Sequence, residues 1–198
     1  KATIEEKLDG FYDRLAIISD EFFKILLVSL EDDLRRGDIL SVTRNIASAL
    51  PGIFLTIPFF STLNHLHQGK HTAEHLASRL NMPTEAHSKR ILWFTDTLSY
   101  MNGVSMTVKK IGWLSYLAGK NLTIVTSIPE EELPEDTPPN VINLPHFFEF
   151  RLPHYEHYKL RVPCLLKSVK HLYQYEPDEI YISTPGPVGL FGLLAAKL

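Results

Sequence analysis

Two short clusters of small and polar residues carry the chemistry that this sequence suggests, and each lies at the end of an apolar run. Asp96 follows the run in residues 90–95, and Ser183, Thr184 and Gly186 lie at and after the end of the run in residues 179–183. A helical pattern follows each cluster. In a parallel α/β sheet this order places a loop at the carboxyl end of a strand, where ligands bind. The sequence therefore predicts two ligand-binding loops.

The turn at Asn102, Gly103 and Val104 lies between the first of these runs and its helix. Gly103 tolerates the positive φ of a tight turn. If Val104 opens the helix, its first free N–H groups and the positive end of its dipole face the loop and suit an anion such as a diphosphate. The alternative is a simple turn, which an Asn-Gly pair more often forms. The full glycine fingerprint of a dinucleotide-binding domain is absent.

Residues 90–198 contain the other pieces of an α/β sheet. The pattern predicts helices in residues 104–117 and 160–175 and strands in residues 121–127 and 141–144, with an irregular strand and loop in residues 146–159. The aromatic residues of that last segment, Tyr155 among them, are expected at the rim of a cleft, and ordinary aromatic packing is the alternative. The sequence thus predicts an α/β fold with a Rossmann-like parallel sheet.

Residues 1–83 are expected to form an all-α helical segment, joined to the sheet by a polar linker in residues 84–90. The first helix, in residues 3–36, has a capping box at Thr3 and ends at Gly37. Further helices are expected in residues 38–50, ending at Pro51-Gly52, in 53–66 as a helix or an irregular segment, and in 72–80. The predicted buried seam of the first helix consists of Leu8, Phe11, Leu15, Ile18, Phe22 and Ile25.

Three interpretations of the helical segment remain open. The simplest is a small helical bundle. The apolar stretch around residues 53–60 suggests instead a peripheral contact with a membrane surface. A metal site is the third, because His65, His67, His71 and His75 lie close together in sequence, but no cysteine or carboxylate completes the set, so solvated histidines are the default. No metal is therefore expected.

Composition excludes several classes of function. A net charge of −3 argues against broad binding of nucleic acid. The single cysteine, Cys164, cannot form an intrachain disulfide and favours a reducing, cytoplasmic setting. The longest apolar stretch, residues 49–63, is too short to span a bilayer. Both ends of the sequence look like cuts through a longer protein, and residues 1–83 look like the end of an upstream domain.

Seven motifs in residues 90–198 point to one enzyme family. They are Phe94-x-Asp96-Thr97, Asn102-Gly103-Val104, Leu117-x-Gly119, Pro153-x-Tyr155, Pro163, Pro177-Asp178 and Thr184-Pro185-Gly186-Pro187-x-Gly189. Together they resemble the N-terminal, acceptor-side domain of family-4 (group 1) retaining glycosyltransferases, which have the GT-B fold. The last motif is the most specific and is closest to the mannosyl- and sulfoquinovosyl-type enzymes. The resemblance covers a little over half of the chain, and residues 1–80 lie outside it.

This resemblance implies a reaction and a set of site residues. Such enzymes are hexosyltransferases that move a sugar from a nucleotide-sugar donor to an acceptor, in some cases a lipid, without a metal or other cofactor. The donor-binding second domain is missing here, so the chain is expected to be half of a GT-B fold and inactive alone. The resemblance places Asn102, Gly103 and Val104 at the donor diphosphate. It places the acceptor and cleft residues at Asp96, Tyr155, Tyr181, Ser183, Thr184 and Gly186.

The catalytic residue stays unassigned. Many family members carry a histidine in or beside the last strand, and Tyr181 and Ser183 stand there in this sequence. Two other functions remain as alternatives. One is a nucleotide-binding Rossmann-like domain of another class, which the missing glycine fingerprint argues against. The other is a non-catalytic interaction module, in which two copies pair through the first helix.

Overall fold

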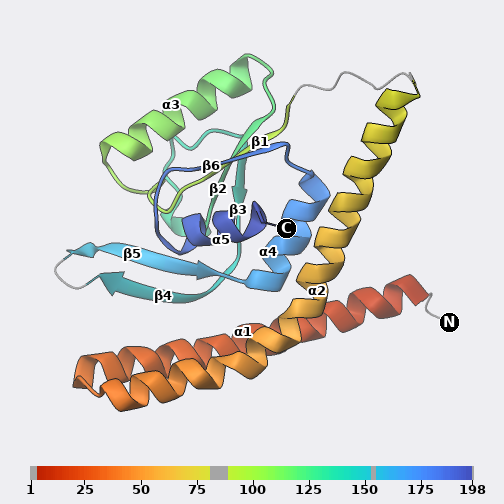
Figure 1. The fold of residues 1–198 in the computed structure, drawn as a ribbon. Helices are drawn as coiled ribbons and strands as arrows, with labels where there is room; N and C mark the ends of the chain where they lie inside the picture. The colour runs from red at the N-terminus through yellow and green to blue at the C-terminus, as the bar shows by residue number, and fades with distance from the viewer. Residues whose placement is uncertain (1–3, 81–88, 153–154, 198) are drawn as a thin grey trace.

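A parallel sheet forms the centre of the α/β half, and two long helices precede it (Figure 1). The computed structural model describes residues 4–80, 89–152 and 155–197, and most of the side chains within them. The helical elements are α1 (Ile4–Arg36), α2 (Ile39–Arg79), α3 (Gly103–Leu117), η1 (Glu130–Glu132), α4 (Leu165–Tyr175) and α5 (Pro187–Ala195). The strands are β1 (Ile91–Phe94), β2 (Leu122–Thr126), β3 (Val141–Asn143), β4 (His146–Leu152), β5 (Tyr155–Pro163) and β6 (Glu179–Ile182).

The sheet has the strand order β3-β2-β1-β6 among the described residues, and all of its neighbouring strands are parallel. Trp93 in β1 pairs with Ile124 on one side and Tyr181 on the other. The chain leaves β1 through α3 toward β2 and β3, and later returns to the opposite side of β1 as β6. The strand order therefore reverses between β1 and β6, and the predicted Rossmann-like α/β fold is confirmed.

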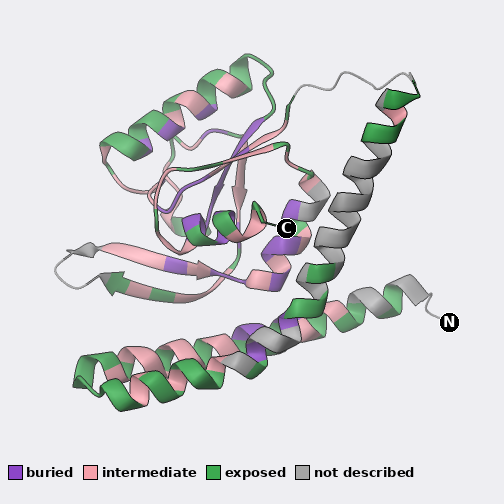
Figure 2. Ribbon diagram, in the orientation of Figure 1, coloured by how far each residue is buried: buried purple, intermediate pink, exposed green. Residues whose placement is uncertain are grey.

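Helices cover both faces of this sheet. Side chains alternate between the two faces along each strand, and both sets are apolar. Leu92 and Phe94 of β1 pack with the helices α4 and α5. Ile91 and Trp93 face the other way, toward α3. Figure 2 shows the buried residues concentrated between these layers. The runs that the sequence marks as strands are thus apolar on both faces, as parallel strands usually are.

The segment that follows β3 differs from the sequence prediction. Residues 146–152 and 155–163 pair as the antiparallel strands β4 and β5, which we call the β4–β5 hairpin, and Phe148 pairs with Val162. The helix expected from residue 160 begins only at Leu165, with Cys164 as its N-cap. The prediction of a helix over residues 160–164 is therefore wrong. The cross-strand pairing with β4 decides the conformation there, and the helical periodicity of the sequence does not.

The helices α1 and α2 form an antiparallel pair. Gly37 adopts a left-handed backbone at the end of α1, and the side chain of Asp38 accepts a hydrogen bond from the Ser41 amide at the start of α2. The predicted end of the first helix at Gly37 is confirmed. Its predicted capping residue, Thr3, lies outside the described residues, as does most of the predicted linker 84–90.

The expected breaks in the second helix are absent. The helix α2 is continuous over Ile39–Arg79 and contains Pro51 and Pro58. A proline inside a helix costs about 3 kcal/mol, so packing must offset this cost. A Cβ atom at Gly52 would lie 2.3 Å from Cε1 of Phe22 in α1, so the two helices approach closely there, and Thr56 is buried. The predictions of an end at Pro51-Gly52 and of separate helices in 53–66 and 72–80 are therefore wrong.

The face that α1 buries is also not the predicted seam. Phe11, Ile18 and Ile25 are exposed. Tyr12 and Ala16 lie on the face that is covered, where the Tyr12 hydroxyl donates a 2.6 Å hydrogen bond to the carbonyl of Leu166 in α4. The small side chain of Ala16 permits a close approach, and this polar contact satisfies a buried carbonyl. The prediction of a buried seam is wrong at these three positions.

The other interpretations of the helical segment gain little support. None of the helices within the described residues has the length and apolar content that a bilayer crossing requires. In the described part of the chain, no three histidine, cysteine, aspartate or glutamate side chains are arranged so that they could hold a metal ion together. His75 is exposed, and the side chains of His65, His67 and His71 lie outside what the structure describes.

A substitution at Gly192 tests the packing of α5 on the sheet. A Cβ atom there would lie 2.6 Å from Cγ of Phe94, a ring atom that cannot move away freely. We expect Gly192→Ala to lower the free energy of unfolding by about 1–3 kcal/mol through overpacking. Urea unfolding followed by fluorescence measures this. The matched control is Gly10→Ala in α1, whose Cβ meets open space and which should not destabilise the protein. Equal stabilities of the Gly192→Ala variant and the parent chain would contradict this packing.

Candidate functional site

A buried carboxylate joins the loop after β1 to the loop after β6. Asp96 is 8% exposed, and its side chain accepts hydrogen bonds from the Thr184 hydroxyl at 2.7 Å, the Val188 amide at 2.8 Å and the Gly189 amide at 3.2 Å. The amide of Asp96 donates in turn to Oγ1 of Thr184 at 2.8 Å. We call this arrangement the Asp96 clamp. It fills the N-terminus of α5 with a negative charge from the protein itself.

The glycines of this loop permit the close approach. A Cβ atom at Gly186 would lie 2.4 Å from Cγ of Asp96, and one at Gly189 would lie 1.8 Å from the carbonyl oxygen of Thr184. Burial raises the pKa of Asp96, and the hydrogen bonds from Thr184, Val188, Gly189 and Gly186 oppose that rise. Three residues predicted for the cleft, Asp96, Thr184 and Gly186, are therefore brought together, and their contacts are with each other.

The remaining cleft residues are placed differently. The amide and the hydroxyl of Ser183 both donate to the carbonyl of Phe94, so Ser183 extends the pairing of β6 with β1. The hydroxyl of Tyr181 donates to Glu179 at the first residue of β6, which lies toward the opposite edge of the sheet from the two loops. Tyr155 is the first residue of β5, and its side chain lies outside what the structure describes.

The predicted diphosphate loop forms the first turn of α3. Asn102 is the N-cap, and its Oδ1 accepts a 2.8 Å hydrogen bond from the amide of Ser105. The hydroxyl of Ser105 donates to the carbonyl of Leu98, which anchors this turn to the loop after β1. Gly103, not Val104, is the first helical residue, and its φ is not positive. The turn needs no left-handed glycine, and helical geometry leaves the Gly103 and Val104 amides without intrahelical acceptors.

The two helix N-termini at this edge differ in charge. The first turn of α3 contains no acidic residue, and a Cβ atom at Gly103 would meet no other atom within 4 Å. The first turn of α5 is filled by the carboxylate of Asp96. An added anion would be repelled at α5 and attracted at α3.

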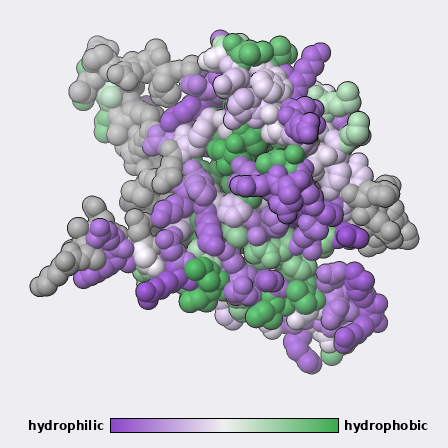
Figure 3. Space-filling view, turned by 180° about the vertical axis from the view of Figure 1, so that it is seen from behind, coloured by the Kyte–Doolittle hydropathy of each residue, from purple (hydrophilic) through white to green (hydrophobic). Residues whose placement is uncertain are grey.

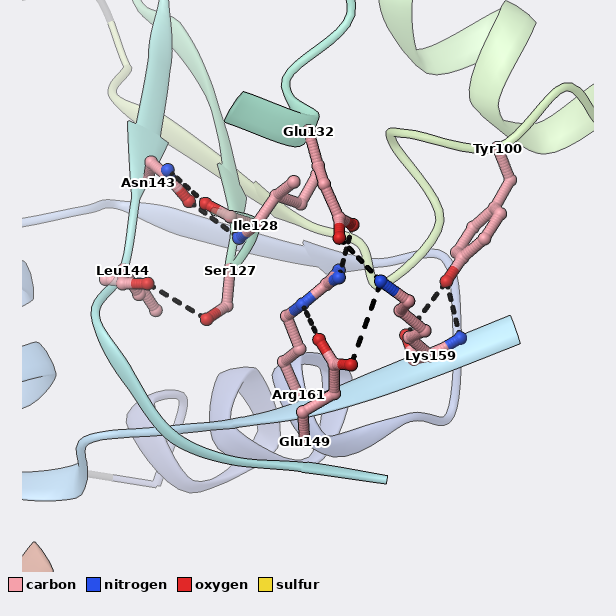
Figure 4. Close-up of polar contacts among 9 residues, drawn as sticks. All are labelled: Tyr100, Ser127, Ile128, Glu132, Asn143, Leu144, Glu149, Lys159 and Arg161. Atoms are coloured by element: carbon pink, nitrogen blue, oxygen red, sulfur yellow. Dashed lines mark hydrogen bonds and ion pairs between the residues drawn. The ribbon is translucent and has the colours of Figure 1, made fainter. Parts of the chain in front are cut away.

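A network of four charged residues holds the β4–β5 hairpin beside these loops (Figure 4). Arg161 of β5 is 3% exposed, and its Nε donates to Glu149 of β4 at 2.9 Å while its Nη2 donates to Glu132 of η1 at 2.5 Å. Lys159 also donates to Glu132, at 2.6 Å. Because η1 follows β2, the network fastens the hairpin to the carboxyl edge of the sheet.

Tyr100 makes a second link from the loop after β1 to the hairpin. Its hydroxyl accepts from the amide of Lys159 at 2.6 Å and donates to the carbonyl of the same residue at 3.0 Å. Its ring lies 4.5 Å from that of Tyr158, measured between centroids. Sequence reasoning did not single out Tyr100, Arg161 or Glu132. Their partners are far apart in the chain, so local patterns hold no signal for them.

A further polar contact lies away from the loops, between α1 and α4. Asp20 of α1 is buried beside Cys164, and Lys167 lies 3.5 Å from its carboxylate. Burial, and then the neighbouring Asp20, raise the pKa of the Cys164 thiol to about 12. This thiol therefore stays protonated and unreactive at neutral pH.

Comparison of the chain with protein-family models, curated proteins and solved structures finds no significant match. The geometry of the two loops and the sequence motifs are therefore the basis on which we propose a function.

The charge network gives a pH-dependent test. Hydrogen bonding to Lys159, followed by the charge of Arg161, lowers the pKa of Glu132. The stabilisation is therefore complete above the ordinary pKa of a glutamate and is lost as the pH falls through the lowered value. We expect Glu132→Gln to cost about 1 kcal/mol of unfolding free energy at pH 7, since Glu132 is partly exposed, and less at about pH 3.

Urea unfolding at the two pH values measures this difference. The matched control is Glu130→Gln, an exposed glutamate in the same short helix. The role of the network would be refuted if the two variants lost the same stability at pH 7.

Proposed function

We propose that residues 89–197 form the acceptor-side domain of a retaining glycosyltransferase that takes a sugar from a nucleotide-sugar donor. The observation that carries the proposal is the pair of loops at the reversal point between β1 and β6. Open α/β sheets bind ligands at this point, outside the carboxyl ends of the strands. The motif resemblance supports the same location, because its most specific run is the loop that follows β6.

The first turn of α3 is the proposed site for the donor diphosphate. When the bond between the sugar and the diphosphate breaks, negative charge grows on the phosphate oxygen that leaves. The free amides of Gly103 and Val104 and the dipole of α3 would stabilise that charge. The filled N-terminus of α5 is unsuitable for this role, because Asp96 already occupies it. In the proposed enzyme the second domain faces α3 across the cleft and binds the nucleotide.

The acceptor is proposed to lie between the loop after β6 and the β4–β5 hairpin. Ser183, Thr184 and Gly186 position the loop, and Tyr100 with Tyr158 forms the wall on the hairpin side. Tyr155, the first residue of β5, is a proposed acceptor residue on its sequence motif alone. Tyr181 is less suited to contact the acceptor, because its hydroxyl bonds to Glu179 at the other end of β6. No cofactor or metal takes part in the proposed reaction.

A second candidate is a non-catalytic pairing of a helical interaction module with a nucleotide-binding Rossmann-like domain. The exposed apolar residues of α1 favour it. The two candidates differ in activity. A glycosyltransferase transfers the sugar of a nucleotide sugar to an acceptor, whereas a binding module only binds the nucleotide. In either case the single, buried Cys164 supports a reducing, cytoplasmic setting. Peripheral contact with the inner membrane face would follow if the acceptor is a lipid.

Substitution of Gly103 tests the proposal in the complete parent protein. We expect Gly103→Val to lower sugar transfer about 100-fold, since the added side chain would hold the diphosphate away from the α3 amides. The fold should be unaffected, because the new Cβ enters open space. Release of nucleoside diphosphate from a panel of nucleotide sugars measures the rate. Gly10→Val in α1, whose Cβ also meets open space, is the matched control.

The same assay distinguishes the proposals. The chain of residues 1–198 alone should show no turnover. Full activity of the Gly103→Val parent would remove the role of the α3 turn. A parent protein that binds nucleotide sugars and transfers none of them would favour the binding module instead.

A further inference from the structure

One face of α1 carries a row of side chains that no described residue covers. The row consists of Phe11, Arg14, Ile18, Glu21, Ile25 and Val28, and we call it the α1 stripe. Its spacings alternate between three and four residues, which is the spacing of positions that meet a partner helix in a coiled coil. Phe11, Ile18 and Ile25 are 61%, 60% and 66% exposed. Figure 2 shows exposed residues along this helix, in green, up to its end at Arg36.

The fold does not need this face. The opposite side of α1 already packs against α2, α4 and β4. Single exposed apolar residues are ordinary, but the four apolar members of the α1 stripe lie on one face of the helix, which indicates a binding surface. Ile17 is 54% exposed and lies directly beside the row. Figure 3 shows apolar residues gathered between hydrophilic ones on the α1–α2 pair at the bottom of the molecule.

The stripe is complementary to itself in charge. Its two charged members, Arg14 and Glu21, make no ion pair with any residue in the described part of the chain. When two copies of the stripe run antiparallel about a centre at Ile17 and Ile18, Arg14 of each copy meets Glu21 of the other. The twofold symmetry makes this pair twice. In a parallel arrangement Arg14 would face Arg14 and Glu21 would face Glu21, which is repulsive.

We propose that the occupant of the α1 stripe is a second copy of this chain, bound in the antiparallel register that pairs Arg14 with Glu21. The contact is a symmetric dimer with isoleucines at its centre and two ion pairs around them. The stripe lies on the side of α1 away from the sheet, so the dimer leaves the proposed cleft open. This inference is independent of the proposed transferase activity.

Charge reversal tests the register. Sedimentation equilibrium of the whole 198-residue chain over a concentration series gives the dimer dissociation constant. We expect Arg14→Glu and Glu21→Arg each to raise that constant at least about tenfold, because each creates like-charge contacts. An equimolar mixture of the two variants should dimerise like the unaltered chain, because the opposite charges meet again. The exposed Lys120→Glu, on the far side of α3, is the control and should change nothing.

Two further measurements complete the test. Ile18→Asp should abolish dimerisation while the far-UV circular dichroism spectrum stays that of the unaltered chain, because Ile18 is 60% exposed in the single chain. A spin label on a cysteine at Lys7 should be about 30 Å from its counterpart in the antiparallel dimer, from the helical rise, and about 10 Å in a parallel one. The native Cys164 thiol is buried and does not compete for the label.

The outcomes are distinct. Dimerisation with mutual rescue and a long label distance supports the proposal. A chain that stays monomeric over the whole concentration range overturns it. Charge variants without effect, or a label distance near 10 Å, overturn the antiparallel register.

Discussion

The carboxylate of Asp96 is the constraint on which the loops of the α/β half depend. It accepts hydrogen bonds from the amides at the start of α5 and from the hydroxyl of Thr184. These bonds fix two loops that are separated by most of the domain sequence. Burying a carboxylate is costly unless several donors surround it, and here the helix dipole adds to them. Any shift of the loop after β6 would leave that charge without partners. The two loops therefore behave as one rigid unit at the carboxyl edge of the sheet.

The clamp also divides the electrostatic roles at this edge. Asp96 satisfies the N-terminus of α5, whereas the first turn of α3 contains no acidic residue. The hairpin of β4 and β5 forms the opposite wall, and the ion pairs of Arg161 hold it in place. Buried ion pairs add little net stability, but removing one partner is costly. Their contribution here is to fix one position of the hairpin relative to the loops.

The sequence predicts the parts of the fold that local patterns decide. The apolar runs at β1, β2 and β6 and the helical period of α3 are strong enough to identify each element. The start of α4 was misplaced because the pairing of Phe148 with Val162 is a long-range contact. The sequence predicts a helix end at Pro51 because local patterns hold no information on the packing of Gly52 against Phe22. The prediction of which face of α1 is buried is wrong for the same reason. Tyr12 on the buried face donates a hydrogen bond to a carbonyl 154 positions away in the sequence.

In the candidate site too, local patterns identify some residues, and long-range contacts that the sequence does not reveal bring the others together. The motifs identify the turn at Asn102 and Gly103 and the loop after β6 as loops at the carboxyl edge of the sheet, because turn chemistry is local. The hydrogen bonds that engage the oxygens of Asp96 could not be predicted, because their donors lie 88 to 93 positions away in the sequence. Arg161, Glu132 and Glu149 come from three elements, and only the folded chain shows that their charges meet.

The position of β6 at the border of the sheet has a consequence for how the fold can be extended. Its neighbour on one side is β1, and the described residues leave its other side unpaired, with Ile182 exposed there. A further strand that added to this border in the parallel sense would end at the same edge as β1 and β6. Its terminal loop would then lie next to Thr184. Growth of the sheet from this border would thus add a third loop beside Thr184 and leave the α3 side unchanged.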